Sequence, residues 1–441
     1  MISRQSADVV KAYRIPRKTG LVFLAVFGLS LFGVSSSSLP LPVTIADATL
    51  AVLITYSLLR YRRLTINGIS RAAIILAILV TASGAVNALR EPAFDTGNFL
   101  SNYLRLVGVV VGVLLLPILL RRIGHDTLAR ASAAVLVVHA LLVIAETTSL
   151  IPPQWFGNAP QDSGGIIRAS GLFSEPSFFG LFVGLSLVYI AQVQLNERRS
   201  YLGAIRLGIV LTAVFISTSV GGIAMGVFGA IALYPGMGWK SRAAMAAGLV
   251  IAAGTLSLVI PSAPDTTIAK SWNYLAERSE RLNPIAFTDR SARVRLVGSW
   301  ELAFAAIREA PLLGQGIGGA SQERTFEKYK ESFRVLRKAG SWIMQASVMH
   351  GVGILGLISF SFIMLRLVFA SRTRWFGVGF ALASVTFGGV FDAYVWWNIA
   401  LASSLLVRGR APRTLDTGGA VSQARPLPGH YRRGRPDLAE E

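Results

Sequence analysis

Long apolar runs separated by short polar segments dominate the hydropathy pattern of this chain. Many of the runs approach or exceed the ~20 residues that an α-helix needs to cross a bilayer, so we predict an all-α polytopic membrane helical bundle of about 12 transmembrane helices. The predicted spans lie at about 19–34, 41–59, 72–89, 98–120, 128–150, 172–193, 202–217, 220–235, 243–260, 342–365, 375–390 and 394–407.

One long polar segment, residues 261–341, interrupts the apolar pattern between the span regions 19–260 and 342–407. We predict that it forms a long, largely helical loop outside the membrane. Residues 1–18 form a basic N-terminal segment, and the first apolar run lacks a small-x-small cleavage site, so it is not a cleavable signal. Residues 408–441 are rich in Arg, Pro and Gly and are predicted to be a disordered basic tail.

The charge distribution predicts the orientation of these spans. The chain is 53% hydrophobic and 15% charged, yet its net charge is +20. Most of the 43 Lys and Arg residues fall in the termini and in alternate short loops, whereas the other short loops hold only Arg90 and Arg168. Basic loops stay on the cytoplasmic side, so both termini are predicted to be cytoplasmic, with loop 261–341 on the outer side. This pattern accounts for the charge without nucleic acid as a partner.

Six ionisable residues within spans or at their ends fall on the predicted outer side. They are Asp47, Arg105, Glu146, Arg168, Glu175 and Asp392. Ionisable groups are expensive in hydrocarbon and often mark function. A carrier for a polar solute is expected to place them near the midplane, so the one-sided set indicates a site in the outer half of the membrane. The alternative is that each residue is interfacial and extends its charge to water.

The start of the span at 172–193 has a structural and a functional interpretation. Pro176 suits the first turn of a helix, where its missing N–H costs nothing. Ser174 would then be the N-cap, and Glu175 a first-turn acid stabilised by the helix dipole. In the functional interpretation, the Glu175 carboxylate acts as a base or orients a bound hydroxyl or arginine.

The polar stretch 288–319 begins with three arginines, Arg290, Arg293 and Arg295. It continues as one amphipathic helix that ends at Pro311. Its apolar stripe of Leu296, Trp300, Ala303, Phe304 and Ile307 is expected to lie on the bundle or on the membrane interface. The run GQGIGG (314–319) fits a dinucleotide-binding pattern, but no strand precedes it, so we predict a helix stop and a tight turn. The arginines are either solvated and ion-paired or form an anion site.

Several stretches resemble bacterial exopolysaccharide and O-antigen polymerases. The relevant segments are RASGLFSEPSFFG (168–180), ISTSVGGIAMGVFGAI (216–231), DRSARVRLVGSWELAFAAIREAPLLGQGIGG (289–319), GVGILGLISF (351–360) and FDAYVWWNIALASSLL (391–406). Their order over residues 165–407 is similar to the O-antigen ligase/polymerase superfamily. Ligases of that superfamily usually place a histidine where this chain has Trp342, and His350 is predicted to pack within a span. This departure favours a polymerase.

The resemblance implies transfer of glycan from a polyprenyl-diphosphate-linked oligosaccharide, in contact with membrane lipid and alongside a flippase and a chain-length regulator. It also implies a bacterial inner membrane as the location, with loop 261–341 in the periplasm. Arginine is always protonated and binds phosphate through two N–H groups, so it suits stabilisation of a diphosphate leaving group. The predicted catalytic residues are Arg295, Arg293, Arg290, Arg168 and Glu175. The predicted substrate contacts are Arg105, Asp392, Trp300 and Trp342. No metal or cofactor is expected; the alternatives are an O-antigen ligase, a lipid-linked glycan transporter or flippase, and a non-catalytic assembly protein.

Overall fold

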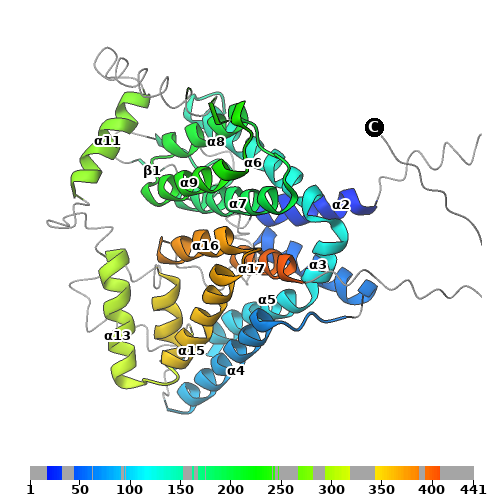
Figure 1. The fold of residues 1–441 in the computed structure, drawn as a ribbon. Helices are drawn as coiled ribbons and strands as arrows, with labels where there is room; N and C mark the ends of the chain where they lie inside the picture. Colours follow the sequence, from blue (N-terminus) through cyan, green and yellow to red (C-terminus); the bar gives the residue numbers. More distant parts are fainter. Residues whose placement is uncertain are drawn as a thin grey trace, which may run out of the picture. The chain divides into compact units, whose positions relative to one another are not determined.

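A computed structural model of the chain describes fourteen stretches between residues 17 and 407 (Figure 1). They are 17–31, 44–61, 63–90, 94, 96–151, 161–162, 167–173, 175–240, 242–243, 247, 267–281, 294–317, 343–386 and 393–407. These stretches belong to one unit, Met1–Val407. The N-terminal residues 1–16, most of the predicted span 243–260 and the tail 408–441 lie outside the described residues, and those predictions stay untested.

Almost all regular structure in the described residues is helical, as predicted. The helices before the long polar segment are α2 (Arg17–Phe23), η1 (Leu24–Gly28), α3 (Ile45–Tyr61), α4 (Gly68–Arg90), α5 (Thr96–Ile123), α6 (His125–Thr147), α7 (Pro176–Glu197), α8 (Ala204–Ile216), α9 (Val220–Leu233) and η2 (Tyr234–Gly236). They continue with α11 (Thr267–Arg281), η3 (Val294–Gly298), α13 (Ser299–Glu309), α15 (Met344–Phe369), α16 (Arg374–Thr386) and α17 (Ala393–Leu406). One small departure is a two-residue antiparallel ladder between β1 (Gln161–Asp162) and β2 (Ile167–Arg168), which places Arg168 in a strand.

Five of the described helices are long and apolar enough to cross a membrane: α4, α5, α6, α7 and α15. They correspond to predicted spans at 72–89, 98–120, 128–150, 172–193 and 342–365. Four further predicted spans form apolar helices of 13 or 14 residues, namely α8, α9, α16 and α17. These are shorter than the ~20 residues of a straight crossing, so the described residues support a membrane helical protein but not the full count.

Helix α7 occupies the centre of the packing and is buried along most of its length. It contacts α6, α9 and α16. Gly180 of α7 lies directly against Gly222 of α9, so close that a Cβ on Gly180 would overlap the Gly222 Cα. Small residues let helix backbones approach in this way, as is common in membrane helix packing. A helix that is apolar on all sides, as α7 is, belongs in such a position.

Side-chain contacts show that α3 and α5 run parallel. Asp47 in the first turn of α3 pairs with Arg105 in α5, and ten residues later the Ser57 hydroxyl donates to the carbonyl of Leu115, 2.9 Å away. Because α4 lies between these helices in the chain and packs on α5, it runs back in the opposite direction.

Helices α4 and α15 run antiparallel. The Ser83 hydroxyl near the end of α4 donates to the Gly351 carbonyl near the start of α15 (2.9 Å). The Ser359 hydroxyl donates to the Ala72 carbonyl near the start of α4 (2.9 Å). At one end of the bundle, helices α3, α5, α7 and α15 begin, and helices α4 and α6 terminate. We call this the polar end. The opposite end, the basic end, holds Arg60, Arg71, Arg121, Arg122 and Arg366 in terminal turns of helices.

An ion-pair network ties the α7–α8 connection to α6 at the basic end. Asp126 accepts from Arg130 at 2.7 Å and from Arg199 at 3.5 Å. The Tyr201 hydroxyl donates to the same carboxylate at 2.9 Å. Burial, together with the Asp126 hydrogen bond and charge, raises the pKa of Tyr201 to about 12, so the hydroxyl stays a donor throughout the physiological range.

Helix α15 is interrupted at Gly353, whose φ of 72° and ψ of −164° are not helical. Residues 311–317 pack into this break: Gln315 N–H donates to the His350 carbonyl (2.9 Å), and Ile354 N–H donates to the Pro311 carbonyl (3.0 Å). A Cβ on Gly314 would lie 2.6 Å from the Gly353 nitrogen. We call this contact, between Gly314 and Gly316 on one side and Gly351 and Gly353 on the other, the glycine clasp. The GQGIGG run thus begins in a turn after a helix stop, as predicted.

Because backbones approach closely in the glycine clasp, we expect a methyl group added there to lower the free energy of unfolding. In Gly353→Ala, the new Cβ would overlap the Leu312 carbonyl and the residue would keep a positive φ, so we expect the free energy of unfolding to fall by about 1–3 kcal/mol or more. Gly108→Ala in α5 is the matched control, because its Cβ would meet nothing within 4 Å; higher helix propensity should leave it equally or more stable. Thermal unfolding in detergent measures both, and equal melting temperatures would contradict the clasp.

Candidate functional site

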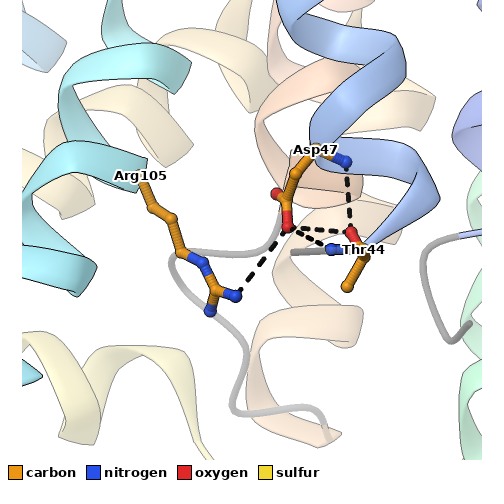
Figure 2. Close-up of polar contacts among 3 residues, drawn as sticks. All are labelled: Thr44, Asp47 and Arg105. Carbon is orange, nitrogen blue, oxygen red and sulfur yellow. Dashed lines mark hydrogen bonds and ion pairs between the residues drawn. The ribbon is translucent and has the colours of Figure 1, made fainter. Parts of the chain in front are cut away.

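An ion pair between α3 and α5 at the polar end joins two of the predicted outer residues, Asp47 and Arg105 (Figure 2). The Arg105 Nη2 atom lies 3.8 Å from Asp47 Oδ2, and the two side chains are 29% and 21% exposed. Arg105 is in the third turn of α5, followed by an apolar stretch. A charge at such a place is costly unless it is paired, and Asp47 supplies the partner. The two residues thus lie at the same end of the bundle, and the assignment of that end to the outer side of a membrane stays a prediction.

Asp47 is itself held by the start of its own helix. Its Oδ2 accepts from the Thr44 N–H and from the Thr44 hydroxyl, both at 2.9 Å. In return, Thr44 Oγ1 accepts from the Asp47 N–H at 3.1 Å. This reciprocal arrangement is a capping box with Asp in place of Glu. The carboxylate is therefore oriented without Arg105, and it in turn positions the guanidinium.

Glu146 fastens the segment that precedes α7 to the end of α6. Its Oε2 accepts from the N–H groups of Ser170 (3.1 Å) and Gly171 (2.7 Å). Gly171 has a φ of 59°, which suits glycine. Hydrogen bonds to a carboxylate are stronger than neutral ones. Glu146 is buried, and its two hydrogen bonds position the segment that follows Arg168.

Glu175 occupies a different position from the one that the first interpretation gave it. Helix α7 begins at Pro176, so Glu175, with φ −145° and ψ 149°, is the N-cap residue and not a first-turn acid; its side chain makes no capping hydrogen bond. Ser174, the predicted N-cap, lies outside the described residues. The half-buried carboxylate accepts from the Ser177 hydroxyl at 3.0 Å. It remains a candidate base.

The helix after the arginine cluster is docked on α15, and part of the predicted apolar stripe faces α15. Ala303 is buried, and Trp300 and Ile307 flank it as expected. However, Leu296 and Phe304 are exposed, and the buried face is Ser299, Leu302, Ala303 and Ala306. Small residues let α13 approach α15 closely, so they take the inner face. Trp300 lies beside Phe304, with ring centroids 5.9 Å apart.

Six predicted site residues lie wholly or partly outside the described residues. The backbone of Arg295 belongs to the π-helical turn η3 that leads into α13. π-helical turns are frequent at functional sites. Nothing can be said of the side chains of Arg295 and Arg168, or of Arg290, Arg293, Trp342 and Asp392. Of the predicted set, the structure brings Arg105 to Asp47 and places Glu175 at the start of α7 and Trp300 on α13.

Sequence reasoning missed the polar groups around the glycine clasp. The Asn87 amide donates to the Ser83 carbonyl (2.8 Å) and to the Gly314 carbonyl (3.1 Å). The Gln315 amide donates to Glu309 Oε2 at 2.6 Å. Asn87 is a polar residue within an apolar helix, and that signal could have singled it out. Within the described stretches, no group of three His, Asp or Glu residues could hold a metal ion.

We expect the Asp47–Arg105 ion pair and its capping box to contribute to the free energy of unfolding. Asp47→Ala removes the carboxylate of the capping box and leaves Arg105 without its described carboxylate partner, so the free energy of unfolding should fall by about 1–3 kcal/mol. Glu277→Ala is the control, because Glu277 pairs with Arg281 on the exposed face of α11, where an ion pair contributes about 0–1 kcal/mol. Chemical or thermal unfolding in detergent compares the two; if Asp47→Ala were as stable as Glu277→Ala, the pair would have no positioning role.

Comparison with known proteins adds no relative. No model of a known protein family matches the chain, and a search of curated proteins found no match either. The resemblance of residues 165–407 to the O-antigen ligase/polymerase superfamily therefore stays a prediction from the order and spacing of motifs, and the function is argued from the residues.

Proposed function

We propose that this protein polymerises polyprenyl-diphosphate-linked oligosaccharide repeat units into exopolysaccharide or O-antigen, as a metal-independent membrane glycosyltransferase. The reaction takes place at the periplasmic face of a bacterial inner membrane. In this proposal about 12 helices cross the bilayer, both termini are cytoplasmic, and the polar end faces the periplasm. The arginines in terminal turns at the basic end support this orientation, because basic residues stay cytoplasmic.

The observation that supports the proposal most is the Arg105 guanidinium, which is held in position between α3 and α5. Arg105 is held by Asp47, which is fixed by Thr44, and the Arg105 side chain keeps 29% of its surface exposed. A guanidinium that is already oriented in a partly dry site stabilises an anion without the cost of reorganisation. The diphosphate of a lipid-linked donor is an anion that would approach the protein at this depth.

The chemistry that we propose is a single displacement of the diphosphate. The hydroxyl oxygen of the acceptor glycan forms a bond to the anomeric carbon of the donor. The anomeric carbon–oxygen bond to the diphosphate breaks, and its electron pair leaves with the diphosphate. The acceptor proton passes to a carboxylate, for which Glu175 at the start of α7 is the described candidate and Asp392 a second.

In this proposal the arginines have two roles. Arg105 binds the donor diphosphate, and Arg295, Arg293 and Arg290 stabilise the charge that grows on it during bond cleavage, with Arg168 opposite them. The docking of α13 on α15 supports this division, because the arginine segment runs directly into a helix that is fixed to the bundle. Trp300 and Trp342 provide faces for sugar rings.

A transporter is the second candidate, and the interrupted helix α15 favours it. Broken helices line substrate sites in many secondary transporters. In this protein, however, residues 311–317 fill the break at Gly353 and hydrogen-bond its backbone, which supports a fixed wall more than a moving gate. A ligase, which transfers one finished glycan, is the third possibility.

The reaction itself is the test of the proposed function. Purified protein in liposomes, supplied with a polyprenyl-diphosphate-linked repeat unit and with neither nucleotide nor metal, should produce glycans of several repeats on a gel. Products that never exceed one transfer would indicate a ligase. Movement of the donor across the liposome without chain growth would indicate a transporter, and either result would overturn the proposal.

Two arginine variants should affect different kinetic constants. Arg295→Ala should lower kcat by about 10²–10³, because it removes stabilisation of the leaving group. Arg105→Gln should mainly raise KM for the donor, because it removes a ground-state contact. Arg281→Ala, on the exposed face of α11, is the control and should change neither constant. Unchanged kinetics in Arg295→Ala, with normal membrane insertion, would exclude a catalytic role for this arginine.

A further inference from the structure

A groove between α4 and α15 opens at the basic end, away from the proposed reaction site. Its volume is about 930 Å³, at the upper end of the range of roughly 300–1,000 Å³ that is usual for small-molecule sites. Asn67, Arg71 and Arg366 line its polar part. Its apolar part includes Ile75, Leu79, Leu355, Ile358 and Phe362. The groove is therefore amphipathic, with its two arginines at the basic end of the bundle.

The two charged residues that line the groove are both arginines. Arg71 lies in the first turn of α4, and Arg366 in the last turn of the antiparallel helix α15, so both guanidinium groups emerge at the same end. No carboxylate lines the groove, and neither arginine has an ion pair with any carboxylate of the described residues. Gly68 lies beneath Arg366: a Cβ there would be 3.1 Å from the Arg366 Nε atom. The two cations thus share one space in which the described residues place no carboxylate.

The apolar part of the groove faces outward. Ile358 is 60% exposed, and Ile75 and Phe362 are exposed as well. The two helices are joined at the base of the groove, where the Ser359 hydroxyl donates to the Ala72 carbonyl at 2.9 Å. The groove is therefore a lateral recess and not a passage between the helices. In a membrane, such a recess is in contact with hydrocarbon.

We propose that this groove binds one anionic phospholipid. The headgroup phosphate lies between Arg71 and Arg366, and an acyl chain follows Ile75, Ile358 and Phe362 toward the middle of the membrane. Guanidinium groups bind phosphate oxygens through paired N–H donors, and basic pockets between helices on the cytoplasmic side bind anionic headgroups. The apolar wall that continues from the arginines distinguishes a lipid from a soluble anion. In the orientation proposed above, the lipid belongs to the cytoplasmic leaflet.

Native mass spectrometry of the detergent-purified full chain tests this site with two probes, phosphatidylglycerol and phosphatidylcholine. We expect the wild-type protein to retain phosphatidylglycerol at least tenfold better than phosphatidylcholine. The double variant Arg71→Gln/Arg366→Gln should lose this preference. Arg121→Gln/Arg122→Gln is the matched control, because these arginines end α5 at the basic end but do not line the groove; it should keep the preference.

Further arms of the experiment separate the sources of phosphate. Excess inorganic phosphate should not displace phosphatidylglycerol; displacement would indicate a site for a free anion and would overturn the proposal. Equal retention of the two phospholipids by the wild-type protein would also overturn it, whatever the variants do. Preferential retention of a polyprenyl phosphate over phosphatidylglycerol would reassign the groove to the polyprenyl lipid. Polymerisation by the double variant is a separate readout, so failure of this site leaves the proposed function intact.

Discussion

The need to satisfy backbone groups within an apolar surrounding governs the polar end of this protein. Helix α15 breaks at Gly353, and a broken helix leaves carbonyl groups that lipid cannot bind. Residues 311–317 supply the missing donors to the carbonyls of His350 and Gly351, and only glycine leaves room for backbones this close. The glycine clasp thereby fixes the end of α13 on the bundle.

The two candidate sites, Asp47–Arg105 at the polar end and the groove at the basic end, hold their charges in different ways. At the polar end, two carboxylates have positioning contacts: Asp47 is held by Thr44 and pairs with Arg105, and Glu146 binds backbone N–H groups. At the basic end, Arg71 and Arg366 have no described carboxylate partner and border an apolar groove. Held charges suit a reaction that needs fixed geometry, whereas arginines without a protein anion suit a mobile lipid.

The sequence predicted those features that follow from local periodicity and chemistry. The five long apolar helices, the end of α13 before Pro311 and the shared side of Asp47 and Arg105 were all predictable. The part of the α13 stripe that packs on the bundle was not, because Ala303 is buried whereas Leu296 and Phe304 are exposed. The pairing of Gly314 with Gly353 was not predictable either, because it joins positions far apart in the chain. Glu175 became the N-cap because α7 begins at Pro176, a shift of one residue that periodicity does not resolve.

The most direct measurement of the central claim is the position at which a polyprenyl diphosphate bearing a photoreactive group crosslinks to the protein. Peptide mapping of the crosslinked protein should place the label at the polar end, in the first half of α5 around Arg105 and in the segment before α13. Competition with an unlabelled lipid-linked repeat unit should remove it. A label confined to the basic end, or one that the repeat unit does not displace, would contradict the account.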